Sequence, residues 1–377
     1  MAGIMVVLGT RPEAIKLAPV VQALRRRGLL VRVCSTAQHR DLVDQFAEEH
    51  DLGVDFDLDL MRAGQGVAEF VARSSTALDR LFARSSPARV IVQGDTATAF
   101  AAAQAAYLTG IPVGHVEAGL RTGDIRQPWP EESFRKAIAL WSDLHFAPTA
   151  RAAKALRAEG VNEDSIHVTG NTIVDAYLSE RSRLAPLHSC IERVLQRAGS
   201  RKIVLATCHR RENIGPGLER IATALRAIAE RPDVLVIVPV HPNPQVREPI
   251  TRALPDRSGI EIVDALPFGP FLQLLGASHF VVTDSGGVQE EAPLLGTPLL
   301  VAREVTERPE GLEAGTAKLV GTSVERIVSE AMQLLDDPLH HARMARKHSP
   351  YGDGRAADRI AEILLREAVP TARASGE

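Results

Sequence analysis

Carboxylates stand directly after short apolar runs in the first half of the chain. Asp95 follows RVIVQG and Glu117 follows IPVGHV, and Glu131 and Glu132 open the segment EESFRKAI. Acids that converge on one site repel each other, so one can keep its proton and serve as an acid while another serves as a base. The alternatives are an N-cap role for Asp95 and a cap or helix-dipole role for Glu131. This spacing predicts an acid–base site.

A second set of residues is suited to phosphate. Ser285, Gly286 and Gly287 follow the run HFVVTD, and we expect a helix to begin near Val288. The N–H groups of such a turn and of the helix N-terminus can bind an anion, and the serine can donate its hydroxyl. Glu291, one turn further on, could accept hydrogen bonds from ribose hydroxyls. The alternative is an ordinary strand-to-helix turn whose glycines relieve crowding.

Basic side chains recur at the same kind of position. Arg11 and Lys16 lie at a strand-to-helix junction, His209 and Arg210 follow KIVLATC, and Arg308 lies in a loop after TPLLVA. Such groups suit the charge of a diphosphate, and a histidine can also move a proton. The alternatives are solvated bases at a capped helix and a salt-bridged surface loop. A structural role and a ligand role are equally open for His39 and His241.

These residues are distributed along a chain in which short apolar runs alternate with helix-like segments. Runs rich in Val, Ile and Leu that are separated by helices are typical of parallel sheets covered on both faces. Ligands then bind beyond the carboxyl ends of the strands. The pattern restarts at Lys202, so we expect two doubly wound domains, 1–170 and 171–354. The runs lie at 4–8, 31–34, 89–93, 111–116, 143–148, 165–170, 202–207, 234–240, 260–264, 279–284 and 297–302.

Size and composition exclude several classes of protein. The 377 residues suggest two domains, and 45% apolar with 24% charged residues is typical of a globular protein. A net charge of −3 argues against a nucleic-acid partner. The three cysteines lack zinc spacing, and there is no GxGxxG motif, so we expect neither a metal nor a cofactor. Without a signal peptide or a membrane-spanning run, we expect a cytoplasmic protein.

Taken together, the motifs resemble those of the non-hydrolysing UDP-N-acetylglucosamine 2-epimerases, in order and over nearly the whole chain. The matching segments are GTRPEAIKLAP, TAQHRDLVDQ, QGDTATAF, GHVEAGLRTGD, PWPEESFRK, TGNTIVDA, HRREN, PVHPNP, TDSGGVQEEAP, TERPEG and YGDG.

The resemblance implies two Rossmann-like domains of the GT-B type that face a central cleft, with a C-terminal helix at about 355–368 packing back on the first domain. It implies reversible inversion at C2 of UDP-N-acetylglucosamine, which gives UDP-N-acetylmannosamine. UDP is eliminated anti to leave 2-acetamidoglucal, and it then re-adds syn. The implied partner is a UDP-amino sugar, and the implied assembly is a homodimer.

The same resemblance implies roles for individual residues. Asp95, Glu117 and Glu131 would carry acid–base and cation-stabilising roles, and His209 would assist at the diphosphate; which carboxylate takes the C2 proton stays open. Positions implied to bind the nucleotide are Arg11, Lys16, Ser285, Gly286, Gly287, Glu291 and Arg308, with Phe271 near the uracil. Positions with a secondary or regulatory role are Gln38, His39, Arg210 and His241.

Two departures from the family pattern bear on these expectations. Leu266 stands where Gln is frequent, which affects the uracil contacts. The segment Gln38-His39-Arg40 is followed by Asp41 rather than Gln, which weakens the case for activation by the substrate.

Alternative functions are a hydrolysing epimerase, an epimerase of a modified UDP-amino sugar, a GT-B glycosyltransferase and a binding module. Three acids around C2 argue against the last two, because neither needs them.

Overall fold

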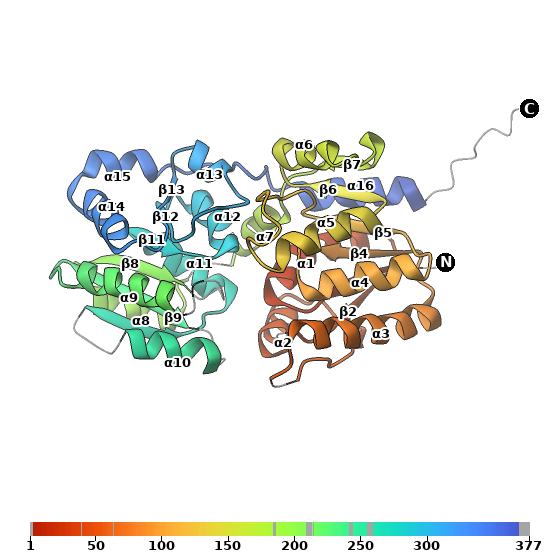
Figure 1. Cartoon of the computed structure of the whole chain (residues 1–377), viewed down its shortest axis with the longest axis horizontal. Helices are drawn as coiled ribbons and strands as arrows, with labels where there is room; N and C mark the ends of the chain where they lie inside the picture. The colour runs from red at the N-terminus through yellow and green to blue at the C-terminus, as the bar shows by residue number, and fades with distance from the viewer. Residues whose placement is uncertain are drawn as a thin grey trace, which may run out of the picture. The chain divides into compact units, whose positions relative to one another are not determined.

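The computed structural model describes residues 3–38, 40–62, 64–183, 186–208, 213, 215–240, 244–254 and 259–368. The chain forms two compact units (Figure 1). The first contains the chain up to Leu178 and again from Tyr351, and the second is Ser179–Pro350. Each unit is an α/β structure around its own parallel sheet.

The sheet of the first unit has seven strands in the order β3-β2-β1-β4-β5-β6-β7, and every pair is parallel. Its central strands are buried along nearly their whole length because helices cover both faces, which explains their continuous apolar sequences. The strands are β1 (Ile4–Leu8), β2 (Val31–Ser35), β3 (Phe56–Asp57), β4 (Arg89–Gln93), β5 (Val113–Val116), β6 (Leu144–Ala147) and β7 (Ile166–Val168).

Three helices of the first unit, α1, α4 and α6, begin with a threonine whose hydroxyl caps the first turn. In α1 the hydroxyl of Thr10 accepts from the N–H of Glu13 in a capping box, and Pro12 lies in the first turn. The helices are α1 (Arg11–Arg26), α2 (Arg40–Glu49), α3 (Val67–Ser85), α4 (Ala97–Leu108), α5 (Glu131–Trp141), α6 (Ala150–Ala158), the 3₁₀ turn η1 (Glu163–Ser165), α7 (Thr172–Arg181), which extends past the unit boundary, and α16 (Ala356–Ala368).

The C-terminal helix α16 packs against α1 within the first unit. The carboxylate of Asp175 accepts from the N–H groups of Ala356 and Ala357, at 3.2 and 2.9 Å, and so binds the start of α16. Arg27 at the end of α1 donates to Asp358 at 2.9 Å. The last helix is therefore fixed to the first unit at its N-terminus and along one face.

The second unit contains a six-stranded parallel sheet in the order β10-β9-β8-β11-β12-β13. Its strands are β8 (Lys202–Thr207), β9 (Val234–Val240), β10 (Ile260–Asp264), β11 (Phe280–Thr283), β12 (Leu299–Val301) and β13 (Ala317–Leu319). Its helices are α8 (Ser189–Ala198), α9 (Pro216–Ala229), α10 (Pro244–Ala253), α11 (Phe268–Ala277), α12 (Gly286–Leu295), α13 (Glu310–Glu313), α14 (Val324–Asp336) and α15 (Pro338–Met344).

The predicted fold class, two doubly wound parallel sheets, is confirmed, and each predicted strand is present within a few residues. The sequence missed β3 and β13. Both are edge strands of two or three residues, too short to produce a recognisable apolar run. In the described part of the chain, no helix has the length and apolar character to cross a membrane.

Candidate active site

The strand order of each sheet reverses at one point, which is where such sheets bind ligands. In the first unit this switch lies between β1 and β4, so it is flanked by the loops at Gly9–Thr10 and Gly94–Thr96. In the second unit it lies between β8 and β11, and the turn after β11 contains Ser285. The candidate residues therefore gather at the carboxyl ends of the central strands of each unit. The predicted residues outside the described parts of the chain are His39, His209, Arg210 and His241.

The loop after β1 requires a glycine at position 9. A Cβ there would lie 2.2 Å from Oγ1 of Thr36 and 2.3 Å from Oγ1 of Thr98. These two hydroxyls are hydrogen-bonded at 2.8 Å, and Thr98 also donates to the side-chain oxygen of Gln38 at 2.9 Å. Gln38 is thus held beside the β1 loop at the switch point of the first unit.

Glu13 is a buried residue that sequence reasoning did not single out, although it lies within the GTRPE motif. Its Oε2 accepts from the N–H groups of Gly9 and Thr10, at 3.1 and 2.8 Å, and from the hydroxyl of Thr10 at 2.8 Å. Its Oε1 accepts from the hydroxyl of Thr96 at 2.6 Å. One carboxylate therefore joins the loop after β1 to the loop after β4, which carries Asp95.

Burial gives Glu13 a pH-dependent effect on stability. Desolvation raises the pKa of its carboxyl from 4.5 to about 7, although its four donors act in the opposite direction. Folding thus favours the protonated form, and the stability that this form provides at low pH is lost as the pH rises through about 7. Between about pH 5 and about pH 8, the wild type should lose on the order of 3 kcal/mol relative to Glu13→Gln, which cannot ionise.

The measurement is denaturant unfolding of both proteins at the two pH values. The two tryptophans, Trp129 and Trp141, belong to the first unit, so their fluorescence reports on the unit that contains Glu13. Glu69→Gln, an exposed change in the same unit, is the control. An equal pH dependence in wild type and Glu13→Gln would contradict the assignment.

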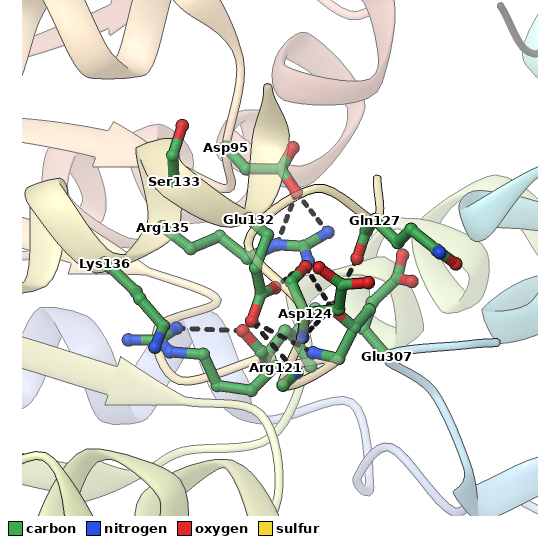
Figure 2. Close-up of polar contacts among 12 residues, drawn as sticks. Asp95, Arg121, Asp124, Gln127, Glu132, Ser133, Arg135, Lys136 and Glu307 are labelled. Atoms are coloured by element: carbon green, nitrogen blue, oxygen red, sulfur yellow. Dashed lines mark hydrogen bonds and ion pairs between the residues drawn. The ribbon is translucent and has the colours of Figure 1, made fainter. Parts of the chain in front are cut away.

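Asp95 is bound by an arginine that the sequence analysis did not name. Nε of Arg135 donates to Oδ2 of Asp95 at 2.7 Å, and Nη2 lies 2.6 Å from the same oxygen (Figure 2). The N-cap alternative for Asp95 is wrong, because Thr96 caps α4 by accepting from the N–H of Ala99. Asp95 is therefore available for a role other than starting a helix.

Arg135 also binds Glu132, so it connects two acids. Its Nη1 donates to Oε2 of Glu132 at 2.8 Å, and Oε1 of Glu132 accepts from the N–H groups of Thr122 and Gly123 at 3.1 and 3.3 Å (Figure 2). Both Arg135 and Glu132 are buried. The signal in the sequence was the spacing of EESFR, which places a glutamate and an arginine three residues apart on one helix face.

Arg135→Lys tests whether the guanidinium group of Arg135 positions Asp95. An ammonium keeps the charge but cannot contact both acids in the planar geometry of a guanidinium. We expect kcat to fall about tenfold, because small displacements of a reacting group are costly. The measurement is the steady-state kinetics of this variant. The control is Arg157→Lys, which alters an exposed ion pair with Glu163. Equal kcat values for the two variants would show that Arg135 serves only the fold.

Glu117 directly follows β5 and is buried between two donors. Nζ of Lys16 forms a close ion pair with its Oε2, and Nδ2 of Asn171 donates to the same oxygen at 2.9 Å. Glu117 has a φ of 65°, in the left-handed region that is uncommon for residues other than glycine, asparagine and aspartate. Such strain is typical of functional positions. The motifs predicted acids that repel each other; instead, Asp95 and Glu117 each contact a cation.

Glu131 is the first residue of α5, one turn before Arg135, where the helix dipole favours a carboxylate. The N-cap residue of α5 is Pro130, which makes no side-chain capping hydrogen bond. Arg11 is the first residue of α1 and is partly exposed.

In the second unit, the helix after β11 begins earlier than the sequence predicted. It begins at Gly286 rather than near Val288, so Gly286 and Gly287 form its first turn. Ser285 is the N-cap residue, but its side chain makes no capping hydrogen bond. Its backbone N–H instead donates to the hydroxyl of Thr283 at 2.9 Å. This arrangement leaves a helix N-terminus that suits an anion.

Arg308 lies in a buried network of charges. Its Nε donates to Oε1 of Glu290 at 2.6 Å, and its Nη1 forms a close ion pair with Glu307. The other oxygen of Glu307 accepts from Arg303 at 2.9 Å. The four side chains are at most 7% exposed. Glu290, Glu307 and Arg303 thus hold Arg308 in place; sequence reasoning had no signal for these pairs.

The remaining predicted residues of the second unit lie near the same sheet. Glu291 is buried on α12, and a Cβ on Gly287 would lie 3.6 Å from its Oε1. Phe271, in the first turn of α11, and Leu266 each pack against a hydrophobic cluster that includes residues of β8, β9 and β11. Among the described residues, no group of three or more His, Cys, Asp or Glu side chains could hold a metal ion.

Known proteins match this chain over nearly its whole length. The family model for UDP-N-acetylglucosamine 2-epimerase matches residues 22–365. Proteins named UDP-N-acetylglucosamine 2-epimerase from Yersinia pestis and Escherichia coli K12 are each 44% identical to it, with 96% of this chain and 98% of the relative covered.

Solved structures of UDP-GlcNAc 2-epimerases are also similar to this chain. The UDP-GlcNAc 2-epimerase of Neisseria meningitidis, bound to UDP-GlcNAc, has a TM-score of 0.92 at 39% identity and covers 97% of this chain and 100% of its own. The Methanocaldococcus jannaschii enzyme, in complex with UDP-GlcNAc and UDP, has a TM-score of 0.88 at 31% identity and covers 97% and 99%. The resemblance in the motifs is thereby confirmed, and the chain belongs to the UDP-N-acetylglucosamine 2-epimerase family.

Proposed function

We propose that this protein interconverts UDP-N-acetylglucosamine and UDP-N-acetylmannosamine without net hydrolysis. The observation that carries the proposal is the pair of carboxylates at the ends of the neighbouring strands β4 and β5, Asp95 and Glu117, each in contact with a cation. Membership of the epimerase family supports the choice of substrate, since relatives have been solved with UDP-GlcNAc and UDP.

The chemistry follows from the weak acidity of the C2 hydrogen, which no carbonyl activates. Breaking the anomeric C–O bond first makes C1 cationic, and the neighbouring C2 proton then becomes acidic. Anti elimination transfers the C2 proton to a base and gives 2-acetamidoglucal and UDP, and syn re-addition of UDP at C1 and of a proton at C2 returns the sugar with C2 inverted. The acids Asp95, Glu117 and Glu131 would move the proton and stabilise the cation.

The second unit supplies groups suited to the leaving UDP. The N-terminus of α12, with Ser285, Gly286 and Gly287, would bind the diphosphate together with Arg308. Glu291 would accept from the ribose, and Phe271 would lie near the uracil. These groups would stabilise the charge that develops on the departing diphosphate. They would therefore contribute to catalysis as well as to the affinity for UDP.

The test is incubation of the protein with UDP-N-acetylglucosamine in D₂O, followed by NMR of the anomeric and C2 protons. We expect deuterium at C2 and accumulation of the manno epimer still attached to UDP. Free sugar and UDP in equal amounts would identify a hydrolysing epimerase instead. The absence of exchange would contradict the proposal and direct the search to a modified sugar.

A further inference from the structure

We propose that Asn171 is a positioning residue for Glu117 and that it connects this carboxylate to the point where the chain re-enters the first unit. The inference rests on the proposed function, in which Glu117 acts at the sugar. Asn171 lies between β7 and α7 and is 3% exposed.

Asn171 uses three polar groups for three different partners. Its Nδ2 donates to Oε2 of Glu117 at 2.9 Å, and its Oδ1 accepts from the N–H of Ile173 at 3.1 Å at the start of α7. Its backbone N–H donates to the carbonyl of Tyr351 at 2.7 Å. The first contact orients the carboxylate of Glu117, the second caps the start of α7, and the third binds the chain that returns at Tyr351.

Glu117 needs a second donor because Lys16 alone does not fix the plane of a carboxylate. A flexible ammonium binds as a point charge and allows the carboxylate to pivot around it. The amide of Asn171 approaches the same oxygen, so Oε2 is held by two groups from different elements. The other oxygen then faces the loop after β4: a Cβ on Gly94, the neighbour of Asp95, would lie 3.9 Å from Oε1. The two donors thereby orient Glu117 toward the loop that carries Asp95.

The returning chain is packed tightly against Asn171. Pro350 is the last residue of the second unit, and Tyr351, the first residue back in the first unit, is 1% exposed. Gly352 has a φ of 130°, and a Cβ there would lie 3.1 Å from Cα of Gly170. Only glycine fits this backbone contact. The chain that re-enters the first unit at Tyr351 is thus bound to Asn171, the same residue that orients Glu117.

Asn171→Asp separates the contact with Glu117 from the structural contacts. The substitution keeps the size of the side chain, the oxygen that caps α7 and the backbone N–H. It replaces the amide donor by an oxygen that repels Glu117. Asn162→Asp is the matched control, because Asn162 is exposed and likewise accepts from a backbone N–H, that of Asp164 at 3.2 Å.

We expect Asn171→Asp to lower kcat for C2 exchange about tenfold or more through misplacement of Glu117. KM, and the affinity for UDP measured by calorimetry, should change less than about twofold, because the groups proposed to bind the diphosphate, Ser285 to Gly287 and Arg308, belong to the second unit. The thermal midpoint should lie below that of Asn162→Asp, because Asn171 is buried and its new carboxylate repels Glu117, so both variants are assayed well below their midpoints. A kcat equal to that of Asn162→Asp would overturn the proposal.

Asn171→Ala removes both the donor and the cap. If this variant loses stability and activity while Asn171→Asp keeps both, Asn171 serves only the helix, and the inference fails. Crystal structures of wild type and Asn171→Asp supply a readout that does not depend on the reaction: the side chain of Glu117 should turn away from residue 171. An absence of C2 exchange in the wild type would contradict the proposed function. A Glu117 side chain in the same position in wild type and Asn171→Asp would contradict this inference alone.

Discussion

Asp95→Asn is expected to lower the rate of C2 hydrogen exchange by about a thousandfold, which is within the range for loss of a general acid or base. Asparagine has nearly the same size, and Arg135 keeps its contact with Glu132, so the loop after β4 should retain its shape. The change removes the charge and the proton-accepting capacity of the side chain. Deuterium incorporation at C2 of UDP-N-acetylglucosamine, followed by NMR, measures the effect.

The control for this prediction is Asp143→Asn. Asp143 also pairs with an arginine, Arg89, but the carboxylate is 48% exposed and precedes β6 at the opposite edge of the sheet. Exchange should be unchanged in this variant, and the affinity for UDP should be unchanged in both. If Asp95→Asn weakened UDP binding while turnover of the bound substrate stayed normal, the catalytic assignment would be wrong.

Glu307→Gln is expected to produce the largest loss of stability. The glutamate pairs with both Arg303 and Arg308, and its change to an amide removes the carboxylate that these two buried guanidinium groups share. The amide can accept from one arginine, but its NH₂ then faces the other. Removing one partner of a buried ion pair costs about 3–5 kcal/mol, so we expect a loss of about 3 kcal/mol.

Calorimetry suits this measurement, because both tryptophans lie in the first unit and do not report on the second. Glu330→Gln is the control in the same unit: its partner Lys318 is 45% exposed, so the pair should contribute at most about 1 kcal/mol. The affinity for UDP should also fall in Glu307→Gln, because Arg308 loses one of its fixed contacts. Equal losses of stability in the two variants would show that the buried network is no more important than a surface pair.

The chemistry of the site was visible in the sequence because its acids and its phosphate-binding turn follow apolar runs directly. An apolar run predicts a buried strand, and a parallel sheet brings the carboxyl ends of its strands to one edge. These are local rules, and they placed Asp95, Glu117 and Ser285 after β4, β5 and β11. They also identified two sheets, and the ordered motifs identified the family.

The partners of these residues were decided only by the tertiary structure. Lys16 and Glu117 are 101 positions apart, and Asn171 and Glu117 are 54 apart. No local pattern links such residues, because their contact depends on the order of the strands and on how each loop folds. The sequence by itself determined which side chains stand at the edge of each sheet, and the tertiary structure determined their hydrogen-bond partners, because those partners come from distant elements that only the folded sheet brings together.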